Sequence, residues 1–73
     1  MAIQIVMDRT GDSRHSFNPN DAQELAKAEQ RFYELTKFGF TAAVRTGPRK
    51  VSQIQSFDPN AEETVFFPRL VGG

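Results

Sequence analysis

The side chains that could carry acid–base or nucleophilic chemistry gather in one short polar segment. His15 is the single histidine of the chain, and Ser13, Ser16 and Asp12 lie close to it in the sequence. A catalytic triad needs a nucleophile, a base and an orienting carboxylate that meet in three dimensions, and closeness along a strand does not supply that geometry. We therefore expect His15 to be a surface or half-buried histidine, and we expect no catalytic residue and no enzyme activity.

Thiol and zinc chemistry are ruled out by composition. The chain has no cysteine and one histidine, so a disulfide scaffold, a thiolate zinc site, a histidine-rich metal site and a cysteine nucleophile are all excluded. We expect no metal site and no bound cofactor.

Length and charge narrow the class of protein further. The 73 residues make one small domain, with 9 basic and 9 acidic residues and therefore no net charge. Nothing in this balance attracts nucleic acid or an anionic membrane. The longest apolar run is three residues, as in Ile5-Val6-Met7, whereas a membrane-spanning helix needs about 20. With no signal-peptide pattern at the start, we expect a cytoplasmic protein without nucleic-acid or membrane partners.

The N-terminal part of the chain predicts a β-hairpin over residues 2–17. Ile3, Ile5 and Met7 are expected on one face of the first strand and Gln4 on the other, with Val6 breaking the strict alternation. Residues 8–12 have turn composition, and a weaker second strand follows at 13–17.

A single helix is predicted from the capping residues near position 20 to about Phe38. Asn18 with Pro19, or Asp21 with Glu24, can cap its first turn, and Gly39 can end it. The spacing of four apolar residues predicts one buried stripe. They are Leu25, Ala28, Phe32 and Leu35.

The second half of the chain predicts three further strands, at 40–45, 51–57 and 64–67, with a short helical turn at 58–62. Phe40, Ala42 and Val44 are expected to face inward. Phe66 and Phe67 are adjacent in a strand and must point to opposite faces, so one of them should be exposed. Pro68 ends the last strand, and residues 69–73 are expected to form a flexible tail after a domain over 1–68.

This order of elements, a small α+β sheet of β-β-α-β-β(-β) with one helix on one face, resembles the ubiquitin-like β-grasp family. The resemblance is carried by two groups of matched residues. Six residues stand at the spacings of ubiquitin's first strand and helix: Ile3, Pro19, Asp21, Glu24, Lys27 and Ala28. Glu63-Thr64-Val65 and Arg69-Leu70-Val71-Gly72-Gly73 look like its last strand and its Arg-Leu-x-Gly-Gly tail. Residues 38–58 have no match, and Val71 stands where ubiquitin has a second arginine.

The resemblance implies a fold and a use for the tail. The first and last strands would lie parallel in the middle of the sheet, with the helix against Ile3, Ile5 and one of Phe66 or Phe67. Gly72 and Gly73 would be the attachment site, and Arg69 and Leu70 would be recognised by a partner. An activating enzyme would use ATP to activate the terminal carboxylate, either for conjugation to a target protein or for sulfur transfer. A deconjugating protease would be a further partner.

The recognition surface is less clear from the sequence. Val44, Ile54 and Phe66 are the candidates for an apolar partner surface on the sheet. A second hypothesis also fits the same residues: a small protein-binding or oligomerising α+β module with no covalent chemistry, in which the Gly-Gly end has no role.

Overall fold

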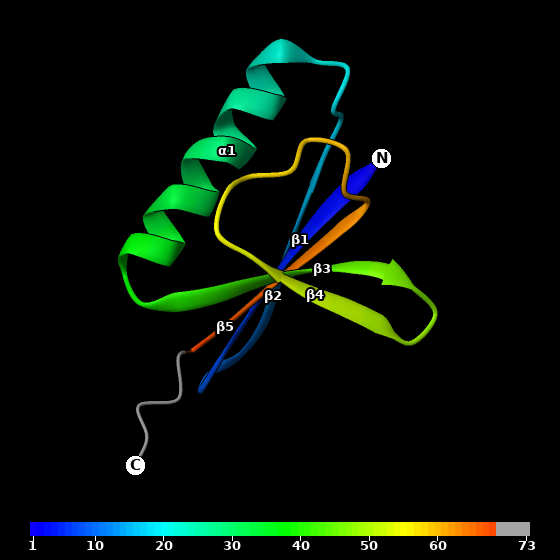
Figure 1. Cartoon of the computed structure of the whole chain (residues 1–73). Coiled ribbons are helices and arrows are strands. Elements are labelled where there is room, and N and C mark those ends of the chain that lie inside the picture. The colour runs from blue at the N-terminus through cyan, green and yellow to red at the C-terminus, as the bar shows by residue number, and fades with distance from the viewer. Residues whose placement is uncertain (69–73) are drawn as a thin grey trace.

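The computed structural model of the protein describes residues 1–68. It is an α+β domain in which one helix crosses one face of a five-stranded mixed sheet (Figure 1). The elements follow one another as β1 (Ala2–Asp8), β2 (Gly11–Phe17), α1 (Ala22–Lys37), β3 (Phe40–Gly47), β4 (Lys50–Ile54) and β5 (Glu63–Pro68). The expected tail over residues 69–73 lies outside the described residues.

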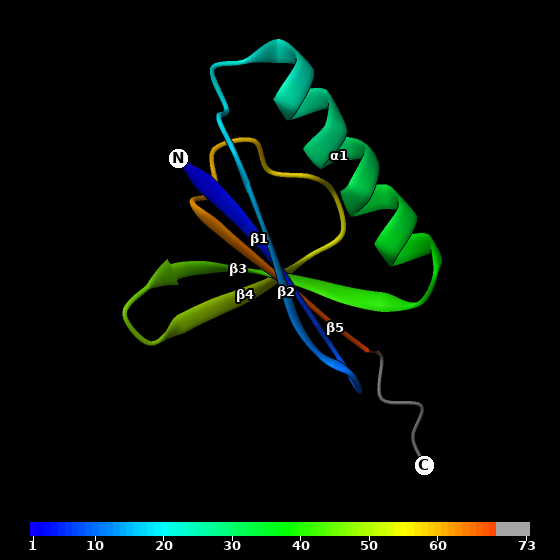
Figure 2. The same cartoon turned by 180° about the vertical axis from the view of Figure 1, so that it is seen from behind.

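The strand order is β2-β1-β5-β3-β4, so the first and last strands occupy the middle of the sheet. β1 and β5 are parallel, with Ile5 opposite Val65, and every other neighbouring pair is antiparallel. The two central strands run side by side in both views (Figures 1 and 2). The expected parallel pairing of these two strands is therefore confirmed.

Local capping chemistry sets the ends of α1. Asp21 is the N-cap, and its carboxylate accepts from the backbone N–H groups of Gln23 and Glu24 at 2.9 and 3.3 Å. The Glu24 carboxylate reaches back to the backbone N–H of Asn18 at 3.0 Å, one turn before the N-cap. At the other end Gly39 has a φ of 108°, a left-handed value that favours glycine. Asp21 is therefore the N-cap, as the second prediction has it, but its own N–H donates to the carbonyl of Asn18 and not to Glu24, so the reciprocal bond of a capping box is not formed.

The helix buries the predicted stripe against the sheet. Ala28 and Phe32 have no exposed surface, and Leu25 and Leu35 are half-buried at the ends of the stripe. Phe32 contacts Val6, Ala42 and Phe66 in the main apolar cluster, and Ala28 joins Ala2 and Phe17 in a second one. Phe57 packs against both clusters and so connects them.

The helix packs on the face of β1 opposite to the one expected, which carried Ile3 and Ile5. Ala2, Gln4 and Val6 face the helix, whereas Ile3, Ile5 and Met7 lie on the other face. Gln4 is completely buried, and its burial is tolerated because both the nitrogen and the oxygen of its amide form hydrogen bonds. Its Nε2 donates to the carbonyl of Ala28 at 2.9 Å, and its Oε1 accepts from Nη1 of Arg31 at 2.9 Å.

The segment between β4 and β5 also differs from the prediction. β4 ends at Ile54 rather than at 57, because Phe57 turns inward to pack against Phe17 and Phe32 at centroid distances of 6.3 and 5.9 Å. The expected helical turn at 58–62 is a single tight turn in which the N–H of Ala61 donates to the carbonyl of Asp58 at 3.3 Å. This loop lies on the same side of the sheet as α1 (Figure 1), so the opposite face carries no covering element among residues 1–68.

Candidate partner-binding surface

The residues predicted to form a partner surface fall on the wrong side of the sheet. Val44 is buried, with 5% of its surface exposed, and Phe66 is buried completely. Ile54 is half-buried and packs against the main apolar cluster. Phe66 is therefore part of the core under α1, Val44 is buried on the same side of the sheet near the loop 58–62, and the predicted surface is corrected at these two positions. The predicted tail residues, Arg69, Leu70, Gly72 and Gly73, lie outside the described residues.

The face of the sheet that α1 leaves uncovered, called here the open face, is built from the alternate residues of each strand. Its central row is set by the register, in which Arg14, Ile5, Val65, Ala43 and Gln53 follow one another across the sheet. Ile5 and Ala43 are buried there by the side chains around them. The open face therefore has an apolar centre, although no helix covers it.

Three large apolar side chains of the open face remain accessible. Met7 is 41% exposed, Phe67 is 37% exposed and Val51 is 57% exposed. Phe67 lies opposite Thr41 on β3, and Met7 is the next open-face position along β1 after Ile5. The prediction that one of Phe66 and Phe67 is exposed is confirmed, and Phe67 is the exposed one. An apolar area without a cover is typical of a surface that contacts another protein.

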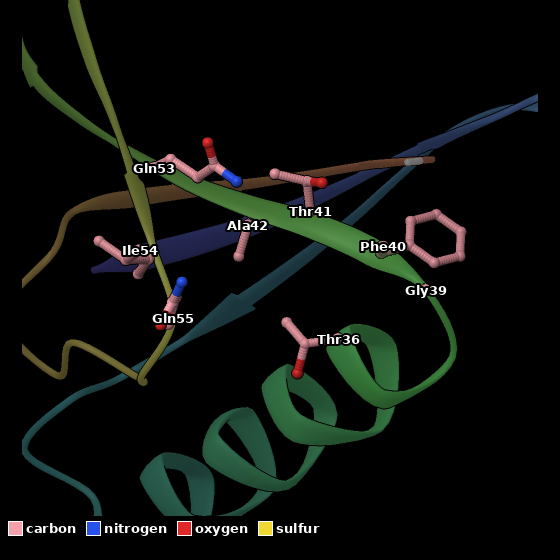
Figure 3. Close-up of a pocket in the computed structure, with 8 residues that line it drawn as sticks. All are labelled: Thr36, Gly39, Phe40, Thr41, Ala42, Gln53, Ile54 and Gln55. Carbon is pink, nitrogen blue, oxygen red and sulfur yellow. The ribbon is translucent and has the colours of Figure 1, made fainter. Parts of the chain in front are cut away.

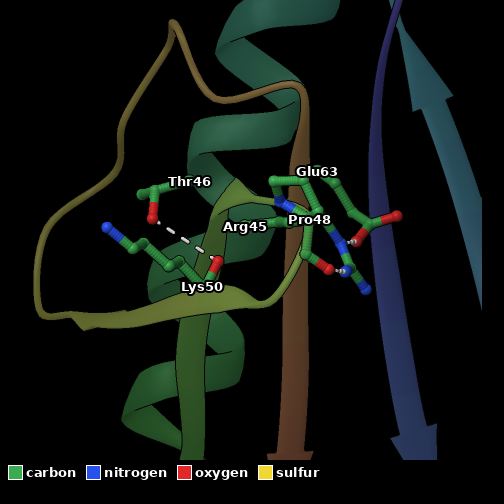
Figure 4. A network of polar contacts seen from close by, with 5 residues as sticks. All are labelled: Arg45, Thr46, Pro48, Lys50 and Glu63. Carbon is green, nitrogen blue, oxygen red and sulfur yellow. Dashed lines mark hydrogen bonds and ion pairs between the residues drawn. The ribbon is translucent and has the colours of Figure 1, made fainter.

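Charged residues border this apolar area. Nε of Arg45 on β3 donates to Oε2 of Glu63 on β5 at 2.7 Å, and Figure 4 shows this pair beside the turn that joins β3 and β4. The guanidinium also donates to the carbonyl of Pro48 at 3.5 Å, and the hydroxyl of Thr46 donates to the carbonyl of Lys50 at 3.4 Å. The ion pair is half-exposed, so it contributes about 0–1 kcal/mol and mainly fixes the direction of the arginine.

A shallow pocket lies on the helix side of the sheet, between the end of α1 and strands β3 and β4 (Figure 3). Thr36, Ala42, Ile54 and Gln55 extend into the space between the helix and β4 in this view. The lining holds hydroxyl and amide groups but no acid, base or thiol. It can form hydrogen bonds to a ligand, yet it offers no group for proton transfer or nucleophilic attack.

Titratable groups are dispersed over the described residues. His15 is half-buried on β2, on the helix side. No group of three or more His, Asp or Glu residues within 1–68 is arranged to hold a metal ion. The carboxylate of Asp8 accepts from the hydroxyl and the N–H of Thr10 at 2.6 and 2.8 Å, and these hydrogen bonds lower the pKa of Asp8. These hydrogen bonds close the β1–β2 turn, so the lowered pKa of Asp8 reflects the structure of the hairpin and does not indicate a reactive site.

The sequence predicts the exposed phenylalanine of the open face but not the β1 residues beside it, because the expected helix contact with Ile3 and Ile5 puts the other face of β1 in solvent. The alternation correctly groups Ile3, Ile5 and Met7 on one face of β1, and in the structure that face is the open face. The burial of Gln4 has no signal in the sequence around it, since its partners lie 24 and 27 residues away.

Comparisons with known proteins add no assignment. Within residues 1–68, no helix is long and apolar enough to cross a membrane. The chain matches no family model, no curated protein and no solved structure.

Proposed function

We propose that this chain is a ubiquitin-like β-grasp protein whose Gly73 carboxylate is activated by a partner enzyme, for conjugation to a protein or for sulfur transfer. The observation that carries the proposal is the topology of the sheet. The β1–β2 and β3–β4 hairpins lie on either side of β5, which runs parallel to β1, and α1 connects the hairpins across one face. This is the arrangement that the resemblance to ubiquitin implies.

The position of β5 also supports the proposal. β5 is a central strand that pairs with β1 on one side and with β3 on the other. It ends at Pro68, which lies opposite Phe40. Because proline has no N–H, it cannot donate a further ladder hydrogen bond. The strand therefore stops at the end of the sheet where α1 passes into β3, and residues 69–73 are joined to the domain at that point.

The chemistry proposed for Gly73 takes place on the partner enzyme. An oxygen of the carboxylate attacks the α-phosphorus of ATP, which forms an acyl-adenylate and releases pyrophosphate. A thiolate of the partner, or a sulfide donor, then attacks the carbonyl carbon, and AMP leaves. Glycine at the last two positions lets the chain approach a nucleophile closely, since it has no Cβ. Gly73 must carry a free carboxylate, whether encoded as the last residue or exposed by proteolysis.

The test is ATP-dependent modification of the chain that ends at Gly73. It is incubated with an adenylating enzyme encoded next to its gene, and the expected results are pyrophosphate exchange and a mass change located at Gly73. Two control variants, one lacking Gly72 and Gly73 and one extended by a residue after Gly73, should give neither signal. Their free energies of unfolding should stay within about 0.5 kcal/mol of the parent. No mass change in the parent chain would reject the proposal.

A specific observation favours a second candidate, a protein-binding module without covalent chemistry. The open face exposes Met7, Phe67 and Val51 around a buried apolar centre. A partner bound there would contact these side chains whether or not Gly73 is ever activated. Affinity capture with the parent chain and with a Met7→Ser/Phe67→Ser variant distinguishes the two. If this candidate is correct, the double variant loses the partner and the deletion of Gly72 and Gly73 keeps it.

A further inference from the structure

Strand β2 is an edge of the sheet, and part of its backbone has no strand partner within residues 1–68. The N–H of Ile3 donates to the carbonyl of Glu62 at 2.9 Å, so the odd residues of β1 direct their backbone groups toward β5 and the even ones toward β2. In the β1–β2 register, Gln4 pairs with His15 and Val6 with Ser13. The N–H and C=O groups of the other residues, Asp12, Arg14 and Ser16, therefore point away from the sheet.

We propose that this edge pairs with the same edge of a second copy of the chain. The two β2 strands would run antiparallel about a two-fold axis at Ser13, so that each Ser13 lies opposite the other. Asp12 of one copy then lies opposite Arg14 of the second copy, and the reverse pair forms on the other side of the axis. Both are residues whose backbone groups point outward, so these are hydrogen-bonded pairs of the new ladder. The result is one continuous sheet through two domains.

The charges on β2 select this register. Asp12 and Arg14 have side chains on the open face and opposite charge, so the pairing places two attractive cross-strand pairs side by side. A shift by two residues places Arg14 opposite Arg14 of the second copy, which is repulsive. The edge is therefore complementary to itself in one register and not in the next.

An apolar groove beside β2 supports the same contact. Phe38, the C-cap of α1, is 85% exposed and lines this groove. The apolar part of the lining is completed by Val6 and Leu35, and its polar part is made by Ser13, His15, Arg31 and Glu34. Because Ser13 lies on the proposed axis and also lines this groove, the grooves of the two copies come together on the helix side of the joined sheet. The pairing thus gives Phe38 a surface against which to pack.

The other edge of the sheet lacks these features. β4 has five residues where β2 has seven, and its pairing with β3 is irregular between Arg45 and Gly47. Lys50 is the charged residue of β4, so no antiparallel pairing of two β4 strands brings opposite charges together. Edge strands usually carry charges that oppose pairing, whereas those of β2 favour it.

The experiment measures self-association by sedimentation over a range of protein concentrations. The parent chain should show a monomer–dimer equilibrium whose dissociation constant rises with added salt. Asp12→Arg or Arg14→Asp alone should raise that constant at least about tenfold, because each change turns two attractive pairs into repulsive ones. The double variant Asp12→Arg/Arg14→Asp should return to within about threefold of the parent. An equimolar mixture of the two single variants should form a heterodimer, since all pairs between them are again attractive.

Backbone pairing is tested separately by amide hydrogen exchange. Exchange at Asp12, Arg14 and Ser16 should slow as protein concentration rises, whereas Ser13 and His15, which already pair with β1, should show little change. Phe38→Ser should weaken the dimer and leave the unfolding of the monomer unchanged. A parent chain that stays monomeric at every concentration overturns the proposal. So does a dimer that both charge reversals leave intact, or protection of these amides only by a strand from a different protein.

Discussion

The rings of Phe32 on α1 and Phe66 on β5 meet edge to face, with centroids 5.7 Å apart and planes inclined by 69°. Both side chains are fully buried. Because β5 is central in the sheet, this contact holds the middle of the helix over the sheet centre, where Phe32 also meets Val6 on β1 and Ala42 on β3.

Phe66→Ala should lower the free energy of unfolding by about 3–5 kcal/mol, since it removes a fully buried ring and leaves a cavity under α1. Phe67→Ala, one residue on but 37% exposed on the open face, should cost about 1 kcal/mol. Urea unfolding of the two variants measures the difference. Equal losses would show that the helix does not cover the face that carries Phe66.

Gln4→Ala should cost about 1–3 kcal/mol, because it removes two buried hydrogen bonds and leaves a small cavity between β1 and α1. The matched control is Gln53→Ala on β4, whose side chain is exposed and whose loss should change stability by less than about 0.5 kcal/mol. Thermal unfolding of both variants provides the measurement. A neutral Gln4→Ala would mean that the amide makes no useful contact with Ala28 or Arg31.

Asp21→Ala should destabilise the domain by about 0.5–2 kcal/mol, because two N–H groups in the first turn of α1 lose their acceptor. Glu29→Ala, in the exposed middle of the same helix, is the control and should be close to neutral. Denaturant unfolding followed by circular dichroism separates the two. If both variants lose the same stability, the N-cap assignment is wrong.

The ionisation of Asp8 should make the free energy of unfolding depend on pH in the acid range. Hydrogen bonds from Thr10 hold the pKa of Asp8 below its ordinary value of 3.8, so the ionised form is favoured in the folded state. Its contribution is therefore fully present above pH 3.8 and is lost as pH falls through the lower folded pKa. The stability difference between the parent and Asp8→Asn should be largest at neutral pH and shrink in acid. Urea unfolding across this range measures it, and a difference that does not vary with pH would contradict the assignment.

Local features of the sequence determined the helix and most of the strand positions. The stripe that contains Ala28 and Phe32, the Asp21 cap and Gly39 are short-range signals, and each acts within a few residues of itself. The β1–β2 hairpin, β3 and β5 were found in the same way. The parallel pairing of β1 with β5 was expected from the resemblance to ubiquitin, and the register confirms it.

Only the tertiary structure decided which face of β1 is buried. By hydrophobicity, Ile3, Ile5 and Met7 are the better candidates for the core, yet Ala2, Gln4 and Val6 lie under the helix. The reason is that Val6 is in register with Phe66, and that the Gln4 amide finds a carbonyl and a guanidinium on α1. Such partners stand far away in the sequence, so a local pattern does not contain them. The same inversion leaves Met7 and Phe67 exposed, and the open face with its apolar centre therefore exists only once the strands are paired.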